Sequence, residues 1–179
     1  MKKIKRALSR VFFHLSRFFL RFLEATYVRL YMVYYLKLLK AYGITFTGTP
    51  RYISTKVKFD DFDQVELGER VVMSENVILL THDYSLTTGL IAVNKEPKTD
   101  IAFIRPIKIR NNVFVGMNTI ILPGTTINEN VIIGAGSVLR GEIPADSIVV
   151  GNPAVVVGKL TDRVAKWEAI LKDVNLKVD

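Results

Sequence analysis

His82 is the residue of this sequence best suited to acid–base chemistry, and it lies in the segment THDYS at positions 81–85. A neutral imidazole has a pKa of about 6.5, so it can take the proton of a hydroxyl group as that group attacks. Asp83, Tyr84 and Ser85 follow directly and are candidate contacts for the molecule that carries the hydroxyl. The sequence contains no cysteine, which excludes a thiol nucleophile, a disulfide and a thiolate metal site.

Asp83 is also a candidate for orienting the imidazole, as a carboxylate does in a catalytic triad. Adjacent side chains in a strand point to opposite faces, so only a turn at positions 82–83 would allow that contact. If the reaction is acyl transfer, direct attack of the hydroxyl group on the acyl donor is a simpler scheme than a covalent intermediate on Ser85. The other histidine, His14, lies among basic residues near the N-terminus, and we assign it no chemistry.

A six-residue repeat on both sides of His82 predicts the elements that position it. One series is apolar: Leu67, Met73, Leu79, Ile109, Val115, Ile121, Ile127, Ile133 and Leu139. Small or β-branched residues follow four positions later: Val71, Val77, Val113, Thr119, Thr125, Val131 and Ser137. A period of six drifts around a helix of 3.6 residues per turn, so it favours short strands joined by tight corners. Three hexads would close one triangular coil, and successive coils would stack about 4.8 Å apart.

The repeat stops at Asp83 and resumes at Ile109, so residues 84–106 are predicted to form a loop pushed out of one coil. Loops longer than about 12–15 residues are uncommon unless they are functional. Several of its residues are apolar, which suggests that it rests on a neighbouring subunit: Leu90, Ile91, Ile101, Phe103 and Ile104.

Upstream, residues 51–66 are predicted to form an irregular first coil. Its acids at 60, 61, 63 and 66 are expected to form a solvated turn, with a cation site as the less common alternative.

The net charge of +8 belongs to one segment. Residues 1–40 contain ten lysines and arginines and one acid, Glu24, whereas the remainder is nearly neutral. Apolar residues three or four apart predict one amphipathic helix there, part of a basic helical segment at 1–45. Arginines interrupt every window of about 20 residues, which argues against a transmembrane span. The segment is expected to lie on an anionic membrane surface, with packing within the protein as the alternative and nucleic-acid binding disfavoured.

Residues 41–50 are predicted to be a linker, because Gly43, Gly48 and Pro50 break the helix. The repeat domain then spans residues 46–160. A C-terminal helix at 161–179, with Val164, Trp167, Leu171 and Val174 on one face, is expected to cover the open end of the coil.

The motifs of the repeat resemble those of a known family. Three segments are similar to the hexapeptide-repeat acyltransferases, which fold as a left-handed parallel β-helix: IGAGSV at 133–138, IP at 143–144 and GNPA at 151–154. THDYS resembles the active-site segment of members that acetylate exopolysaccharide sugars. The resemblance covers about residues 48–160. It implies a homotrimeric, acetyl-CoA-dependent O-acetyltransferase that uses His82 as the general base on a sugar hydroxyl. The lack of cysteine and the basic helical segment predict a protein in the cytoplasm, peripheral on the inner face of the membrane.

In this family coenzyme A lies in a groove between subunits and is held largely by backbone groups. The matching positions here are Phe114, Met117, Ala135 and Arg140. Many relatives follow GNPA with basic residues that meet the coenzyme phosphates, whereas valines stand at 155–157 here. The resemblance therefore leaves the phosphates to Lys159, Arg163 or Arg140, and it implies no metal.

The sequence bears on three other functions. N-acetylation of an amino sugar would use the same scaffold and the same base, so the sequence does not separate it from O-acetylation. A non-catalytic membrane-associated scaffold is disfavoured by a histidine at the start of the loop. A zinc carbonic anhydrase on a β-helix needs three histidines at the metal, whereas the repeat domain has one.

Overall fold

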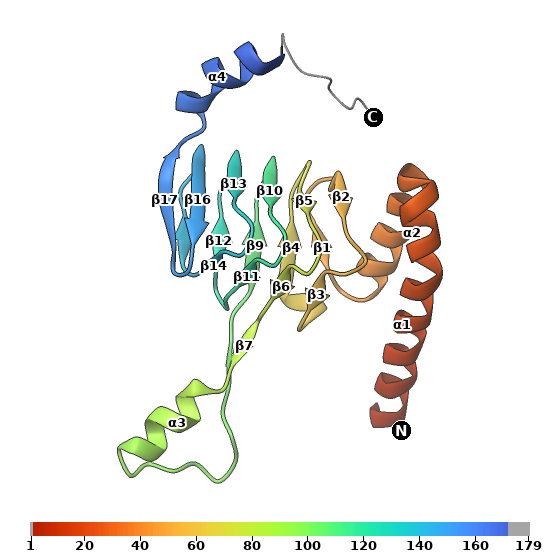
Figure 1. Ribbon diagram of the computed structural model, residues 1–179. Coiled ribbons are helices and arrows are strands. Elements are labelled where there is room, and N and C mark those ends of the chain that lie inside the picture. The colour runs from red at the N-terminus through yellow and green to blue at the C-terminus, as the bar shows by residue number, and fades with distance from the viewer. Residues whose placement is uncertain (1, 172–179) are drawn as a thin grey trace.

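The hexad repeat forms a three-sided prism of stacked parallel strands, as the sequence predicts (Figure 1). The computed structural model describes the backbone of residues 2–171 and the side chains of residues 11–13, 15–164 and 166–171. Face A consists of β1 (Thr45–Phe46), β4 (Val65–Leu67), β9 (Ile107–Ile109), β12 (Thr126–Ile127) and β15 (Glu142–Ile143). Face B consists of β2 (Tyr52–Ile53), β5 (Val72–Met73), β10 (Val113–Val115), β13 (Val131–Ile133), β16 (Ser147–Gly151) and β17 (Ala154–Lys159). Face C consists of β3 (Lys58–Phe59), β6 (Ile78–Leu79), β11 (Ile120–Ile121) and β14 (Val138–Leu139).

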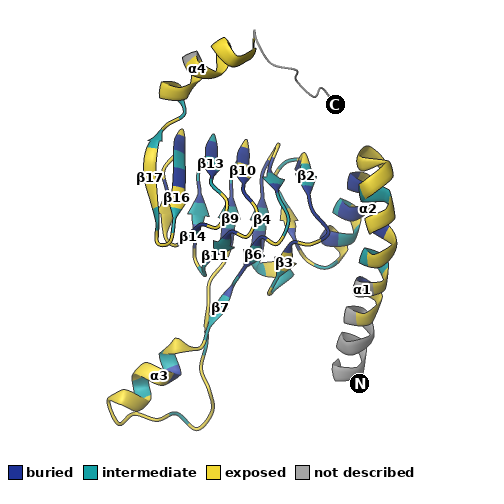
Figure 2. Cartoon of the chain, viewed as in Figure 1, coloured by how far each residue is buried: buried dark blue, intermediate teal, exposed yellow. Residues whose placement is uncertain are grey.

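The core runs along the inside of the prism, where every predicted hexad residue is buried (Figure 2). Leu67, Met73 and Leu79 are fully buried, one on each face of the same coil. The small fifth positions such as Thr119 and Ser137 are also fully buried, because they point inward at the corners. Ser137 satisfies its hydroxyl by donating to the carbonyl oxygen of Gly134 at 2.6 Å. The predicted alternation of large and small inward residues is confirmed.

Asparagines stack at the corners, where the backbone reverses. Asn112 and Asn130 both have a positive φ, of 56° and 57°, a conformation that asparagine tolerates better than other residues with a side chain. The side-chain amide of Asn112 donates to Asn130 at 2.8 Å, and that of Asn130 donates to Asp146 at 2.8 Å. This hydrogen-bonded column holds one corner of the prism in register through three coils.

The outward side chains differ in polarity among the three faces. Each set lies in register across its strands, so the side chains form one line along a face. The outward line of face A is polar: Thr45, Glu66, Lys108, Thr126 and Glu142. That of face B is apolar: Tyr52, Val72, Phe114, Ile132 and Ile148. On face C, Ile78, Ile120 and Val138 follow Lys58.

The loop at 84–106 leaves the prism between faces C and A and projects away from it (Figure 1). Its two arms pair as an antiparallel ribbon of β7 (His82–Asp83) and β8 (Phe103–Ile104), and it contains the helix α3 (Ser85–Ala92). The sequence predicts only an irregular loop, so the ribbon and the helix are additions. Ile91, Ile101 and Ile104 remain exposed in this chain, because no other part of the prism reaches them.

Two helices lie across the end of the prism where the first coil begins (Figure 1). These are α1 (Lys2–Thr26) and α2 (Val28–Ala41), and they replace the one helix predicted over residues 1–40. A straight helix of 40 residues would be about 60 Å long, whereas a prism side spans only about six residues, or about 20 Å. The break at Tyr27 lets both helices contact the coil. The predicted linker at 41–50 is also shorter than expected, since β1 within it already pairs with β4.

Contacts from both helices attach them to the first coil. The buried Tyr31 of α2 donates its hydroxyl to the carbonyl oxygen of Ile53. Glu24 of α1 accepts hydrogen bonds from the Tyr52 hydroxyl at 2.7 Å and from the amide and hydroxyl of Thr55 at 3.1 and 2.5 Å. The helix hairpin is therefore a packed layer of the domain, as the alternative prediction for this segment had it.

The C-terminal helix does not cover the open end of the coil in this chain. It is α4 (Thr161–Leu171), and Val164, Trp167 and Leu171 are 43%, 40% and 57% exposed. The expected fourth member of that face, Val174, lies outside the described residues. The prediction fails because β17 turns back antiparallel on β16 and takes the last edge of face B, which leaves α4 beyond it (Figure 1).

Candidate functional site

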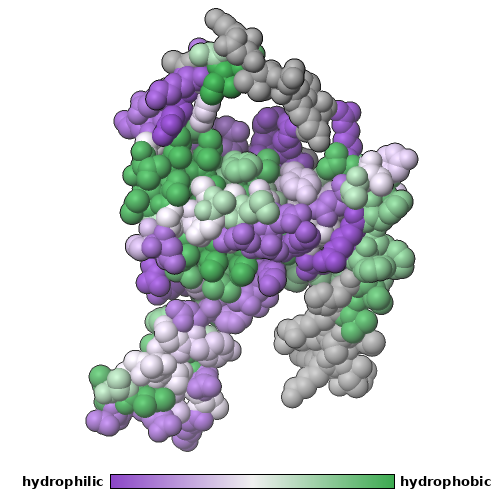
Figure 3. Space-filling model, in the orientation of Figure 1, coloured by the Kyte–Doolittle hydropathy of each residue, from purple (hydrophilic) through white to green (hydrophobic). Residues whose placement is uncertain are grey.

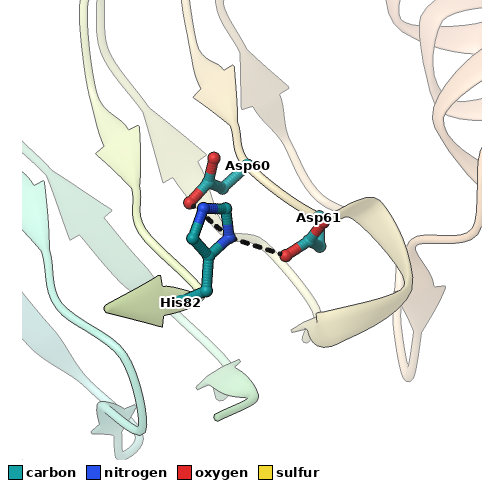
Figure 4. A group of neighbouring side chains, drawn as sticks. All are labelled: Asp60, Asp61 and His82. Atoms are coloured by element: carbon teal, nitrogen blue, oxygen red, sulfur yellow. Dashed lines mark hydrogen bonds and ion pairs between the residues drawn. The ribbon is translucent and has the colours of Figure 1, made fainter. Parts of the chain in front are cut away.

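His82 lies where the chain leaves face C and the loop at 84–106 begins. Its ring faces two carboxylates of the first coil, those of Asp60 and Asp61 (Figure 4). Its Nδ1 atom is 3.0 Å from Oδ2 of Asp61 and 3.1 Å from Oδ2 of Asp60. About a third of the imidazole side chain is exposed, so a reactant can reach the ring. A neutral ring that carries its hydrogen on Nδ1 would donate it to these carboxylates, and Nε2 would then hold the lone pair that accepts a proton.

The Asp61 carboxylate is held by a second contact. The Thr81 hydroxyl, which is fully buried, donates to Oδ2 of Asp61 at 2.8 Å and accepts a hydrogen bond from the Asp61 amide at 3.2 Å. Thr81 therefore joins the strand that carries His82 to the turn that carries its carboxylate. This pattern of base, orienting carboxylate and supporting hydroxyl is the one that fixes the tautomer of a catalytic imidazole.

The hydrogen bond with Asp61 raises the pKa of His82 above its ordinary value, and the negative charge of Asp60 adds to that rise. Partial burial of the ring opposes the two carboxylates because it disfavours the charged form. The raised pKa makes the neutral imidazole a stronger base than a free histidine.

The side chains that follow His82 lie on two sides of the ribbon formed by β7 and β8. The Tyr84 ring lies beside the imidazole, edge to face, with centroids 5.6 Å apart. Asp83 points away from it and accepts a hydrogen bond from the Ser85 amide at 2.8 Å, which lowers the pKa of its carboxyl. Asp83 thus does not orient His82. No turn forms at 82–83, because both residues belong to β7, whose side chains alternate.

A small cavity of about 240 Å³ opens on the Asp83 side of the ribbon. It is lined by Asp83, Ser85, Phe103, Arg105, Leu122, Pro123 and Arg140. The Arg105 guanidinium lies over the Phe103 ring, 4.7 Å from its centroid. Arg140, predicted as a coenzyme contact, therefore shares a cavity with two residues predicted as acceptor contacts.

The remaining predicted coenzyme contacts lie elsewhere on the prism. Met117 and Ala135 are neighbours at the corner between faces B and C, where the Gly136 amide donates to the Met117 carbonyl at 2.8 Å. Phe114 is on the outside of face B and 44% exposed, and Lys159 is at the end of β17. Within one chain these residues are on different sides of the prism from His82, so they do not form a single site with it.

A second candidate surface is the outer side of the helix hairpin. Among the described side chains of α1, α2 and the break at Tyr27, ten large apolar ones are between 46% and 70% exposed: Val11, Phe12, Leu15, Phe18, Phe19, Phe22, Tyr27, Leu30, Val33 and Tyr34. We call them the aromatic surface. Among the described helices, none combines the length and the apolar character that crossing a bilayer requires.

Sequence reasoning missed Asp60 and Asp61 as partners of His82. Their carboxylates and the imidazole bring three ligand-type atoms within 4.8 Å of one another. The signal was the repeat itself, since stacking places residues one coil apart side by side. The first coil is irregular, however: Lys58 pairs with Ile78, twenty positions later, whereas three hexads would make eighteen. The acids at 63 and 66 do not join the site, and Glu66 instead pairs with Arg110 at 2.7 Å.

Comparison with known proteins agrees with this fold. Residues 106–141 match the family model described as bacterial transferase hexapeptide (six repeats). The chain is 35% identical over 104 residues to the galactoside O-acetyltransferase of Escherichia coli K12, covering 58% of this chain and 48% of that protein. It spans about half the length of the curated relatives it matches.

Solved structures share the prism. A maltose O-acetyltransferase from Clostridium difficile 630 superposes with a TM-score of 0.54 at 26% identity, over 69% of this chain and 73% of that one. A galactoside acetyltransferase in complex with coenzyme A superposes with a TM-score of 0.58 at 22% identity, over 88% and 83%. The left-handed parallel β-helix predicted by the resemblance is confirmed, and residues 106–141 carry the hexapeptide repeat of bacterial transferases.

Proposed function

We propose that this protein is an O-acetyltransferase that transfers an acetyl group from acetyl-CoA to a sugar hydroxyl of a polysaccharide or glycolipid precursor, with His82 as the general base. Nε2 of His82 takes the hydroxyl proton as the oxygen attacks the thioester carbonyl. An ester C–O bond forms, the C–S bond breaks, and the imidazolium returns its proton to the departing thiolate. Such a base contributes about 10²–10⁴-fold to the rate.

The observation that carries the proposal is the contact between Nδ1 of His82 and the Asp61 carboxylate at 3.0 Å. This contact favours the tautomer in which Nε2 is the free base, on a ring that solvent reaches at the root of a long excursion. The relatives support the reaction class, because the galactoside and maltose enzymes bear the names of sugar O-acetyltransferases.

We infer further that the site is completed between chains of a homotrimer. His82 and the residues predicted to hold coenzyme A, such as Met117 and Ala135, lie on different corners of one prism. Only a neighbouring prism could bring the corner between faces B and C close to His82. The apolar outward lines of faces B and C supply two contact surfaces, and face A supplies a polar outer wall. Figure 3 also shows hydrophobic side chains gathered over the β16–β17 end, where Val155, Val156 and Val157 are exposed.

The aromatic surface supports the proposal that the protein binds peripherally to the inner face of a cytoplasmic membrane. Its apolar side chains point away from the prism, and residues 1–40 provide ten cations to meet anionic headgroups. This placement would concentrate the enzyme beside lipid-linked sugar acceptors.

The test is to incubate the full-length protein with labelled acetyl-CoA and a panel of neutral sugars, amino sugars and lipid-linked sugars. Wild-type protein and His14→Ala should form an alkali-labile ester on one acceptor, whereas His82→Ala should lose at least a hundredfold in turnover. His14→Ala is the matched control because the chain has two histidines. Undiminished turnover in His82→Ala would refute the assignment of the base, and an alkali-stable amide product would move the reaction to N-acetylation.

A further inference from the structure

Four aromatic rings join the helix hairpin to the turn at residues 60–61, which carries both carboxylates of the site. Phe59 precedes the turn and Phe62 follows it, and their rings stack with centroids 5.6 Å apart. Phe13 of α1 meets Phe62 edge-on at 5.0 Å. Tyr42, which follows α2, contacts Phe13 at 4.8 Å and Phe62 at 5.6 Å. We call these four residues the aromatic cluster.

The cluster is the packed part of an otherwise open region. Phe13 is only 5% exposed, although its helix neighbour Phe12 is 61% exposed. The side chains of Asp60 and Asp61 themselves are 29% and 40% exposed, so burial does not hold them in place. The position of Asp61 depends on its hydrogen bonds to Thr81, and both aspartates depend on the backbone between the two stacked rings.

The other charged groups near the turn belong to the hairpin and to the short helix η1 (Phe62–Gln64). The Arg17 guanidinium lies over the Phe13 ring, 5.5 Å from its centroid, and also donates to the Thr55 carbonyl. Asp63 lies against Gly43, the residue at which the hairpin ends. Neither group is among those that shift the titration of His82, which responds to Asp60 and Asp61.

We propose that the aromatic cluster is a positioning element for the catalytic pair: the hairpin, seated through Phe13 and Tyr42 on Phe62, holds the turn at which Asp61 meets His82. The N-terminal helices would then set the geometry of the active site, in addition to any membrane contact. Without the contacts of Phe13 and Tyr42 with Phe62, the Asp61 carboxylate would be free to move away from Nδ1 of His82. A displacement of about 1 Å can cost about a hundredfold in rate. This inference depends on the proposed role of His82 as the base.

The test uses Phe13→Leu in the full-length protein, with a soluble acceptor and no membrane present. The expected result is a fall in kcat/KM of about tenfold, together with a shift of its rising limb toward lower pH, because the imidazole loses part of its contact with Asp61. Trp167→Leu is the matched control, since it also replaces an aromatic ring, in α4 at the far end of the prism. The kcat/KM of this control, and the pH at which its kcat/KM rises, should equal those of the wild type.

A double-mutant cycle separates positioning from general destabilisation. If Phe13 acts through Asp61, then Phe13→Leu should cause no further loss in an Asp61→Asn background. Tyr42→Leu approaches the same ring from α2 and serves as the second variant if Phe13→Leu does not fold, as judged by circular dichroism. Losses that multiply, or a pH limb that stays in place, would overturn the inference while leaving His82 as the base. If His82→Ala kept the kcat/KM of the wild type, that result would instead refute the proposed function.

Discussion

The proposed role of His82 as a base depends on what surrounds Nδ1 rather than on its own segment of sequence. Asp61 faces it at 3.0 Å and Asp60 at 3.1 Å, both from the preceding coil. Thr81 holds Asp61 by two hydrogen bonds, so the carboxylate is aligned before any substrate arrives. Such preorganisation costs nothing at the moment of reaction, which is why it raises the rate.

Replacement of Asp61 by asparagine should move the pH profile. As the proposed base, His82 acts in its neutral form, so kcat/KM is expected to rise with pH through the pKa of His82. Asp61 stabilises the protonated ring and raises that pKa, so Asp61→Asn should lower it and shift the rising limb toward lower pH. We also expect kcat/KM on the plateau to fall by about tenfold or more, because the tautomer is no longer fixed.

The measurement is kcat/KM between about pH 5 and 9 with one acceptor. Asp83→Asn is the matched control, because its carboxylate accepts from the Ser85 amide and does not contact the imidazole. Its limb should coincide with that of the wild type, whatever its effect on the absolute rate. If the rising limb shifted in Asp83→Asn and not in Asp61→Asn, the carboxylate that orients His82 would be Asp83, and the role given to Asp61 would be wrong.

At the scale of the elements, the corners of successive coils lie close together, because the coils stack at the spacing of paired strands. A Cβ atom added at Gly116 would lie 2.5 Å from the Ala135 amide nitrogen of the next coil. No flexible side chain is involved, so the backbone itself would have to move.

Gly116→Ala should therefore destabilise the protein by about 1–3 kcal/mol. Gly89→Ala is the control: Gly89 lies in α3 and an added Cβ meets nothing within 4 Å, so alanine should be neutral or stabilising by up to about 1 kcal/mol. The midpoint of urea unfolding measures both. Equal midpoints for the two variants would contradict the close stacking at this corner.

The helix hairpin has two faces with different partners. One side packs on the first coil through Tyr31, Tyr35 and Leu39, while the aromatic surface remains exposed. A face this apolar, in a segment this basic, is expected to be buried in the interfacial region of an anionic bilayer.

Replacing Phe18, Phe19 and Phe22 by serine should abolish binding to vesicles that contain anionic lipid. Each ring buried in the interface contributes about 2 kcal/mol, so the loss of three should weaken binding at least a hundredfold. Flotation of the full-length protein measures this, and wild-type flotation should also weaken as salt is raised. Val164→Ser with Ile170→Ser, exposed apolar residues of α4, should float as the wild type does. Unchanged flotation of the triple variant would remove the membrane proposal.

At the scale of the whole molecule, the prism has two sides suited to association and one suited to solvent. Ile78, Ile120 and Val138 lie in register on face C, and a longer apolar line lies on face B. On face A the corresponding line is polar and carries both charges, with Glu66 and Lys108 in register. A single chain leaves the apolar lines partly uncovered, whereas three chains could cover both.

Ile120→Asp should reduce the mass in solution from that of a trimer toward that of a monomer, because a charge would be buried at the contact. Thr126→Asp makes the same kind of change on face A, beside Lys108, and should leave the trimer intact. Mass measurement by light scattering distinguishes the two. A trimeric Ile120→Asp would show that face C is not the contact.

The amino-acid sequence by itself determined the fold of the repeat domain, because a six-residue period with small fifth positions fits only a stacked three-sided coil. It also located His82, since the period fails directly after it, and the basic segment before residue 40. These features are local, so composition and spacing reveal them. Tertiary structure alone decided that Asp61 faces His82, because two extra residues in the irregular first coil change which side chains stack. It also decided that the N-terminal segment folds into two helices, since their length is limited by the width of the coil end on which they pack.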